Sequence, residues 1–349
     1  MSRLVRCSVL AFTLAACNSR APEQPAPAAP IASAPPAPAP TPPPAVPPPS
    51  PEEQKRAEEL QKLEQDYAKL KTDHEAELQR FGPELRAAAQ RLAEAHYASG
   101  EAALRAALAS PHRKPGNAER DAQRHPLETL TFFGFKPTLH VFEYGPGEGW
   151  YTELLAPALA KRGKLAVNMT DPNGPREERA TYYGQRTALF LDKSSELYGK
   201  VERVGVDPKS PHLQHENTFD LVLVFRGLHG MVNAGTLDAW LSEFHEALKP
   251  AGVLGVEQHR GKPDAAPEVS AKQGYLPEPW VIQKIESAGF KLAGKSEINA
   301  NPRDTKDHPE GVWTLPPAYR LKDKDREKYA AIGESDRMTL KFVKVARPR

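Results

Sequence analysis

The chain has 349 residues, of which 36 are proline and only two are cysteine, at positions 7 and 17. A disulfide framework and a thiolate zinc site are excluded, because each needs more sulfur than one pair near the N-terminus can supply. Lysine and arginine number 47 and aspartate and glutamate 45, so the chain has no bulk field that would attract nucleic acid. We therefore expect no nucleic-acid partner.

The first seventeen residues have the pattern of an export signal. The first six hold two arginines and no acid, residues 7–14 are mostly apolar, and Leu14-Ala15-Ala16-Cys17 ends the run. The apolar stretch is too short to span a bilayer. This end resembles the lipobox of bacterial lipoproteins, which implies removal of residues 1–16 and lipidation of Cys17. The alternatives are an ordinary secretory signal and an apolar N-terminus that is not cut.

The lipobox resemblance also predicts where the protein works. It implies an exported bacterial lipoprotein on the periplasmic side, held to a membrane through Cys17. Asn18 in place of aspartate after the cysteine favours the outer membrane over the inner one.

An Ala/Pro-rich tract follows the cysteine. Fifteen of the 36 prolines lie between Pro22 and Pro51, and this segment has almost no large apolar residue. Such a composition cannot bury enough surface to offset its ordering entropy. We expect residues 17–51 to form a lipidated cysteine followed by a disordered linker.

Residues 52–110 predict helices. Leu60, Leu63, Tyr67 and Leu70 recur at helical spacing, and Gly82-Pro83 divides the segment in two. A coiled coil usually has at least about three or four heptads, and this heptad-like stripe is shorter. A stalk that self-associates and a helical hairpin docked on the following domain both fit this pattern.

Strand-like and helix-like segments alternate from residue 111 to residue 349. The expected strands are Leu139–Tyr144, Lys164–Met169, Val201–Val206, Phe219–Phe225, Gly252–Gln258, Phe290–Ile298 and Met338–Val345. Short apolar runs between helices indicate crossover units and a parallel sheet that is covered on both faces. Residues 111–349 are therefore predicted to form one α/β domain.

The most informative motif joins the first expected strand to a helix: Glu143-Tyr144-Gly145-Pro146-Gly147-Glu148-Gly149. Glycine has no side chain to block a ligand and tolerates unusual dihedral angles. The spacing differs from the Gly-x-Gly-x-x-Gly of dinucleotide enzymes, and the Gly-Lys-Ser/Thr of a P-loop is missing. The motif predicts a cofactor loop, with a structural turn or a loop for another nucleotide as alternatives.

This motif resembles the S-adenosylmethionine (SAM) loop of class I methyltransferases, in which an acid, here Glu143, stands two residues before the first glycine. Three later segments agree in order and spacing with strands of that family: Asn217–Phe225, Leu248–Val256 and Met338–Lys344. The resemblance implies a Rossmann-like, seven-stranded α/β sheet with an antiparallel last strand. It also implies SAM as the cofactor.

A closer resemblance, from about Arg113 to the C-terminus, is to a bacterial family of predicted methyltransferases, many of which carry export signals. It rests on the segments Glu119–Leu130, Gly147–Glu153, Phe225–Gly230 and Ser296–Pro317. The family brings a fold and a cofactor class but no established methyl acceptor.

The resemblance also implies the cofactor-binding residues. Those of the loop are Glu143, Tyr144, Gly145, Gly147 and Gly149. A second acid, after the second strand, would hold the ribose hydroxyls, and Asp171 is the best match, because a carboxylate can accept two hydrogen bonds from a diol. Many family members have this acid at the strand tip itself, where this chain has Asn168-Met169-Thr170.

The loop after the fourth strand, which lies beside the methyl group in this fold, holds the candidate catalytic residues Arg226 and His229. His229 would act as a base with a pKa near neutrality; packing of the loop is the alternative. Arg226 would hold an anionic substrate group through its forked donors; an ion pair with Glu257 is the alternative. We expect no metal site, because His212 and His215 lack an accompanying carboxylate pattern.

The sequence thus predicts an exported, membrane-anchored SAM-dependent methyltransferase that acts on an unknown small-molecule or envelope acceptor. Two other functions stay open. One is a non-catalytic ligand-binding module that keeps the methyltransferase fold. The other is an envelope scaffold that works through residues 52–110.

Overall fold

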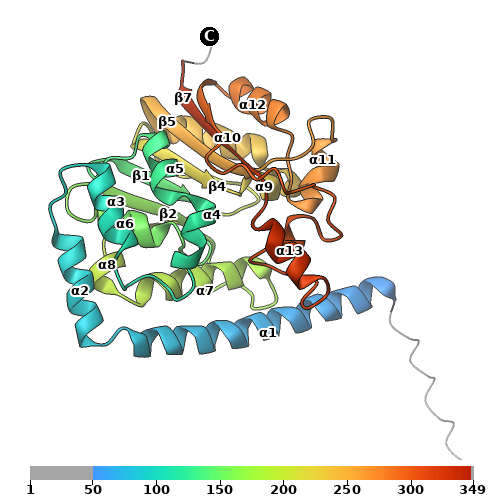
Figure 1. Ribbon diagram of the computed structural model, residues 1–349, viewed down its shortest axis with the longest axis horizontal. Helices are drawn as coiled ribbons and strands as arrows, with labels where there is room; N and C mark the ends of the chain where they lie inside the picture. Colours follow the sequence, from blue (N-terminus) through green and yellow to red (C-terminus); the bar gives the residue numbers. More distant parts are fainter. Residues whose placement is uncertain (1–49, 347–349) are drawn as a thin grey trace, which may run out of the picture. The chain divides into compact units, whose positions relative to one another are not determined.

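A seven-stranded mixed sheet lies at the centre of the computed structural model, which describes residues 50–346 (Figure 1). The predicted signal peptide, the lipidation site Cys17 and the Ala/Pro linker lie outside the described residues. Within residues 50–346, no helix is long and apolar enough to cross a membrane.

All seven predicted strands are present. They are β1 (His140–Tyr144), β2 (Lys164–Met169), β3 (Glu202–Gly205), β4 (Phe219–Phe225), β5 (Leu248–His259), β6 (Phe290–Ser296) and β7 (Arg337–Lys344). Their order in the sheet is β3-β2-β1-β4-β5-β7-β6. Strands β1 to β5 pair in parallel, and β7 runs antiparallel to both β5 and β6. The predicted α/β sheet with an antiparallel last strand is therefore confirmed.

The strand order reverses between β1 and β4. From β1 the chain builds outward through β2 to β3, and it then returns to place β4 on the other side of β1. In open α/β sheets, ligands bind outside the carboxyl ends of the strands at such a reversal. The glycine motif follows β1 and so lies at this position.

Helices cover both faces of the sheet. Apolar side chains of one face pack with α2 (Pro83–Glu94), α3 (Gly100–Leu108), α5 (Pro126–Phe133), α6 (Thr152–Leu159), α7 (Arg179–Asp192) and α8 (Ser195–Tyr198). Those of the other face pack with α9 (Leu228–Ala234), α10 (Leu237–Ala247) and α12 (Glu278–Ser287). The remaining helices are α1 (Pro51–Arg80), α4 (Asp121–Arg124), α11 (Pro267–Ser270) and α13 (Arg326–Ile332). Burial on both faces explains why β4 is almost continuously apolar.

The long helix α1 begins at a capping box and docks along α7. The Ser50 hydroxyl accepts a hydrogen bond from the Glu53 backbone N–H, and the Glu53 carboxylate accepts one from the Ser50 N–H. Leu63 and Tyr67 are buried, and the Tyr67 ring meets Tyr182 of α7 edge-on at 5.3 Å between centroids. The apolar stripe of α1 therefore packs against α7 of the same chain. Figure 1 shows these two helices side by side.

Segment 52–110 packs against the rest of the domain except at the start of α1, where residues 52–59 are exposed. Beyond α1, the helices α2 and α3 both pack against α6, and the residues from Ser50 onward belong to one compact unit. The docked hairpin therefore describes the structure better than the stalk. The stripe that suggested a coiled coil faces the chain's own α7, because the same apolar spacing serves either contact.

Candidate functional site

The loop after β1 presents bare backbone at the edge of the sheet. Gly145, Gly147 and Gly149 have φ angles of 60°, 63° and 80°, in the left-handed region that favours glycine. A Cβ at Gly145 would meet no atom within 4 Å, and one at Gly147 would meet nothing nearer than 3.9 Å. At Gly149 it would lie 2.1 Å from the Phe190 ring. The third glycine therefore permits packing against α7, whereas the first two face open space.

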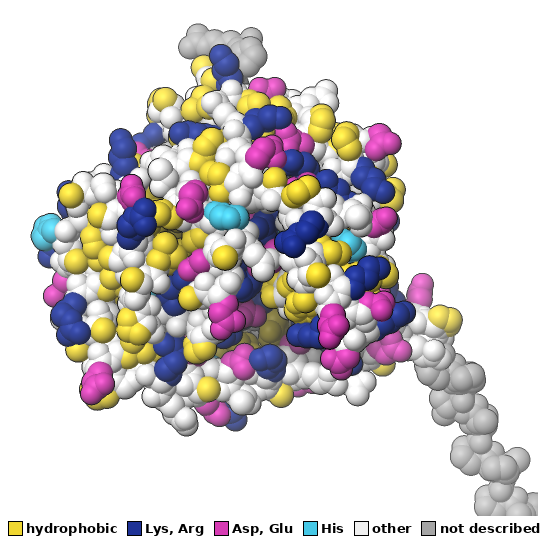
Figure 2. Space-filling view, viewed as in Figure 1, with side chains coloured by type: hydrophobic (Ala, Val, Ile, Leu, Met, Phe, Trp, Pro, Cys, Tyr) yellow, Lys and Arg dark blue, Asp and Glu magenta, His cyan; other side chains and the backbone are white. Residues whose placement is uncertain are grey.

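A cleft of about 1030 Å³, which includes space open to solvent, lies beside Gly145 and Gly147; we call it the glycine-loop cleft. The ends of β1, β2 and β3 line it together with α7, α9 and α10. One wall is aromatic, since Tyr144 packs edge-on against Trp240 with 4.7 Å between ring centroids. In the view of Figure 2 the molecule is hollowed near the centre of its face. Apolar walls with a few polar groups are typical of small-ligand sites.

Asn168, at the end of β2, fixes the glycine loop. Its Oδ1 accepts a hydrogen bond from the Gly145 backbone N–H at 2.6 Å. Because a backbone N–H can only donate, the side-chain oxygen must face the loop, and the amide NH₂ group is left to donate elsewhere. Asn168 also lines the glycine-loop cleft. Its amide is therefore a donor that a ligand in this cleft can reach.

The structure does not bring Asp171 into the glycine-loop cleft. This residue is exposed, and its Oδ1 accepts a hydrogen bond from the Asn173 backbone N–H at 2.8 Å. It lines an adjoining hollow with Gly174 and Asp207. One oxygen of the carboxylate therefore closes a turn in the loop between β2 and α7.

Glu143 is buried beneath the loop and does not line the cleft. Only 2% of its surface is exposed, and its Oε2 accepts a hydrogen bond from the hydroxyl of Thr152, the first residue of α6, at 2.7 Å. Burial raises the pKa of Glu143 to about 7, against the opposing effects of the Thr152 hydrogen bond and the charge of Arg226. The carboxyl group therefore joins β1 to α6 and titrates near neutral pH.

Glu143→Gln should stabilise the protein at pH 8 and leave its stability almost unchanged at pH 4. The folded pKa of about 7 lies above the ordinary value of 4.5, so folding loses stability as the pH rises from 4.5 to 7. At 1.36 kcal/mol per pKa unit, the gain at pH 8 is about 3 kcal/mol. Urea unfolding at both pH values measures it. An equal gain at both would mean that the titration of Glu143 is not its cause.

Arg226 forms the ion pair that the sequence analysis gave as its alternative. Its φ is 55°, its backbone N–H donates to the Glu257 carbonyl at 2.6 Å, and its Nη1 donates to Glu257 Oε1 at 2.9 Å. Glu257 is fully buried and also accepts from the Tyr151 hydroxyl at 2.9 Å and pairs with Arg337 Nε at 3.0 Å. We call these four residues the Glu257 network; it anchors the loop after β4.

His229 packs in the loop region beyond β4. Its Nδ1 accepts a hydrogen bond from the Gln258 amide at 3.3 Å, and its ring lies 5.7 Å and 5.8 Å from the His259 and Trp313 rings. Burial lowers the pKa of His229 to about 4, well below the expected value near neutrality. Neither His229 nor Arg226 is among the described residues that line the glycine-loop cleft. The packing alternative therefore fits His229 better than a role as a base.

The two histidines considered for metal binding each face a glutamate. His212 Nδ1 lies 3.4 Å from Glu243, and His215 Nε2 lies 3.0 Å from Glu202. Across residues 50–346, no group of three His, Cys, Asp or Glu side chains is placed to hold a metal ion.

Helix α7 brings side chains to the cleft that the motif analysis did not include. They are Arg179, Tyr183 and Arg186, whose spacing of four and three residues puts them on one helix face. No aspartate or glutamate is among the described residues that line the cleft. The charged side chains of the lining are therefore basic. Their helical spacing was visible in the sequence, but nothing there showed which face of α7 meets the cleft.

Known structures share this fold, although no protein-family profile and no curated protein matches the sequence. One similar structure is a SAM-dependent methyltransferase from Aquifex aeolicus, with 18% identity over 66% of this chain and 94% of that chain and a TM-score of 0.42. The N-methyltransferase NodS from Bradyrhizobium japonicum has 14% identity over 66% and 99% of the two chains and a TM-score of 0.39.

Two further solved structures are similar to this one. The 1,6-didemethyltoxoflavin-N1-methyltransferase from Burkholderia thailandensis, with S-adenosylhomocysteine bound, has 14% identity over 65% and 80% of the chains and a TM-score of 0.39. The [4+2]-cyclase SpnF has 17% identity over 68% and 86% and a TM-score of 0.45. A similar fold does not by itself determine the reaction.

Proposed function

We propose that this protein is a SAM-dependent methyltransferase that binds its cofactor in the glycine-loop cleft. The observation that carries the proposal is the geometry of Gly145 and Gly147. Both have left-handed backbones and both face open space, at the carboxyl end of β1 where the strand order reverses. A side chain at either position would fill the space that bare backbone leaves for a ligand.

Two other features support SAM in this cleft. The amide of Asn168, held in place by Gly145, can donate to a ribose hydroxyl oxygen, and we therefore assign the ribose to Asn168 instead of Asp171. Tyr144 and Trp240 supply an apolar wall that excludes water from the ligand.

When bound, SAM supplies a methyl group on a positively charged sulfur: an acceptor lone pair forms the new bond to the methyl carbon while the carbon–sulfur bond breaks and the sulfur keeps its electron pair. The protein must hold the acceptor atom in line with the carbon–sulfur bond and exclude water from the two reactants. The acceptor is a small molecule or a component of the cell envelope.

Asn168→Ala and Asp171→Ala test the cofactor site as a matched pair. Asn168→Ala removes a ligand donor and the acceptor for the Gly145 N–H, so we expect SAM binding to weaken by about tenfold, or about 1.4 kcal/mol. Asp171→Ala should change the affinity by less than about twofold, because its carboxylate serves only a turn. Titration calorimetry of the full chain measures both. If Asp171→Ala weakened SAM binding more than Asn168→Ala, the ribose would be assigned to Asp171.

A second candidate function is a binding module without turnover. It is favoured by the placement of His229 and Arg226, because neither is among the described residues that line the glycine-loop cleft. SAM binding without formation of S-adenosylhomocysteine, in the presence of fractionated envelope extract, would support the module and argue against the enzyme.

We also propose that the protein is an exported lipoprotein anchored at Cys17, on the support of the lipobox-like Leu14-Ala15-Ala16-Cys17 alone. Cells fed labelled palmitate should incorporate the label into the wild-type protein and lose it in Cys17→Ser. Label that persists in Cys17→Ser would count against the lipid anchor.

A further inference from the structure

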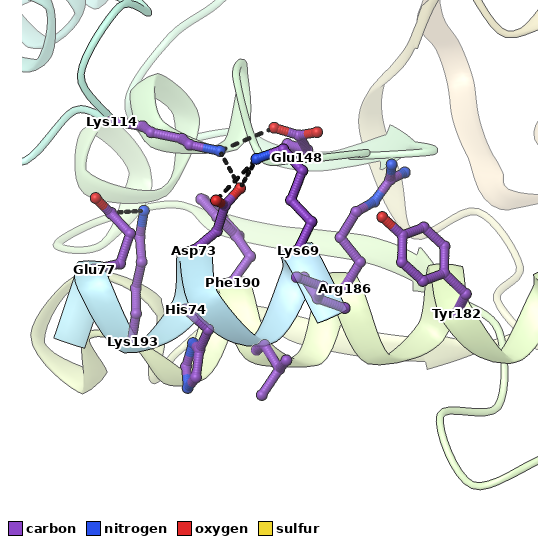
Figure 3. A pocket seen from close by; sticks show the side chains of 12 residues that line it. Lys69, Asp73, His74, Glu77, Lys114, Glu148, Tyr182, Arg186, Phe190 and Lys193 are labelled. Carbon is purple, nitrogen blue, oxygen red and sulfur yellow. Dashed lines mark hydrogen bonds and ion pairs between the residues drawn. The ribbon is translucent and has the colours of Figure 1, made fainter. Parts of the chain in front are cut away.

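A second cavity lies between α1 and α7, beside the glycine loop (Figure 3). We call it the α1–α7 cavity. Leu70 of α1 and Leu189 and Phe190 of α7 give it apolar walls. Charged side chains from both helices and from the loops that carry Lys114 and Glu148 surround these walls.

The charges around this cavity are paired, with one exception. The pairs are Lys69–Asp73 at 2.7 Å, Lys114–Glu148 at 3.1 Å and Lys193–Glu77 at 3.0 Å. Arg186 forms no ion pair or hydrogen bond with any residue from 50 to 346, and its Nε is buried without a partner. In Figure 3 no dashed line reaches its guanidinium group. Arg186 is therefore a cation without an ion-pair partner at the rim of the cavity. Its charge acts on Glu148, but the Glu148 carboxylate is bonded to Lys114.

The position of Arg186 connects the two cavities. It lines both the α1–α7 cavity and the glycine-loop cleft, and its Nη2 lies 3.9 Å from where a Gly147 Cβ would be. Its guanidinium carbon lies 4.9 Å from the Tyr183 ring centroid and 5.7 Å from that of Tyr182. These rings hold the cation without neutralising it. Figure 3 shows the Tyr182 hydroxyl on the same side as the guanidinium.

The missing counter-ion is specific to Arg186. Arg176, just before α7, pairs with Glu64 of α1 at 2.7 Å. Arg179, within α7, pairs with Asp66 of α1. The same two segments thus neutralise two neighbouring arginines and leave the third for another partner.

We propose that the α1–α7 cavity binds a small amphipathic carboxylate. The carboxylate meets Arg186 and the Tyr182 hydroxyl, and the apolar body packs against Leu70, Leu189 and Phe190. A guanidinium offers a carboxylate two parallel N–H donors, and a half-buried cation gains more from an anion than a fully solvated one does. This site needs no SAM, so its test is independent of the proposed function.

The probes are octanoate and its neutral counterpart octanamide, titrated separately into the full chain without SAM. We expect octanoate to bind at least about tenfold more tightly than octanamide. Arg186→Gln should reduce the affinity for octanoate to that for octanamide. Arg176→Gln is the control and should leave octanoate binding unchanged, because Arg176 is already paired with Glu64 and lines neither cavity. Circular dichroism checks that each variant is folded.

Three results would overturn the site. The first is equal binding of octanoate and octanamide by the wild type. The second is an equal loss in Arg176→Gln and Arg186→Gln. The third is an Arg186→Gln variant that loses SAM binding but keeps octanoate binding. Arg186 would then bind the carboxylate of SAM and not that of octanoate. If Arg186→Gln does not fold, Leu189→Trp, which fills the cavity, should abolish octanoate binding and leave the charge in place.

Discussion

Gly147→Val should abolish measurable SAM binding and leave the protein folded. A Cβ added at Gly147 would face open space beside the cleft, with no atom nearer than 3.9 Å. A valine side chain would therefore occupy the volume assigned to the cofactor. The φ of 63° adds strain of about 1–2 kcal/mol, which is less than the usual stability of a domain, about 5–15 kcal/mol. Calorimetry measures the binding, and urea unfolding confirms the fold.

Gly116→Val is the matched control. Its φ of 83° imposes the same kind of strain, and a Cβ there would meet no atom within 4 Å, compared with a nearest atom at 3.9 Å for Gly147. Gly116 does not line the glycine-loop cleft. The control should bind SAM like the wild type. If both variants lose SAM binding equally, backbone strain and not a filled cleft is the cause. If Gly147→Val still binds SAM, the cofactor does not bind at this loop.

Glu257→Ala should destabilise the protein by about 3–5 kcal/mol, the usual effect of removing one partner of a buried ion pair. Glu257 is fully buried and holds Arg226, Arg337 and the Tyr151 hydroxyl. Its removal leaves the Arg226 guanidinium without its anion, whereas Arg337 keeps its ion pair with Glu334 at 2.6 Å. Urea unfolding at pH 7 measures the change.

Asp238→Ala is the control for an exposed ion pair. The Asp238 carboxylate lies 2.8 Å from Lys284 Nζ, but 79% of its side chain is exposed. The Asp238→Ala substitution should lower the free energy of unfolding by less than about 1 kcal/mol. A loss as small as this in Glu257→Ala would mean that the Glu257 network does not anchor the loop after β4.

The sheet could be predicted from sequence because its strands are short apolar runs bounded by turns. Burial on both faces removes the polar positions that would blur such runs, as in β4 (Phe219–Phe225). The glycine loop was equally visible, since Gly145 and Gly147 need backbone angles that other residues avoid.

The sequence could not decide which partner each site residue has, because this depends on where the chain turns and on contacts distant in sequence. Asp171 has the right residue type, but its Oδ1 accepts from the Asn173 backbone N–H and it is not among the described residues that line the glycine-loop cleft. For Arg226 the ion pair with Glu257, 31 residues further along the chain, was one of two alternatives, and the structure contains this pair. The stripe of α1 could not reveal its partner either, because one helix face fits another chain or its own domain equally well.

A crystal structure of the protein with S-adenosylhomocysteine would show whether the glycine-loop cleft is the cofactor site. We expect the adenosine to lie against Gly145 and Gly147 and a ribose oxygen to lie within hydrogen-bond distance of the Asn168 amide. A ligand bound elsewhere, or an empty glycine-loop cleft at saturating ligand, would contradict this expectation.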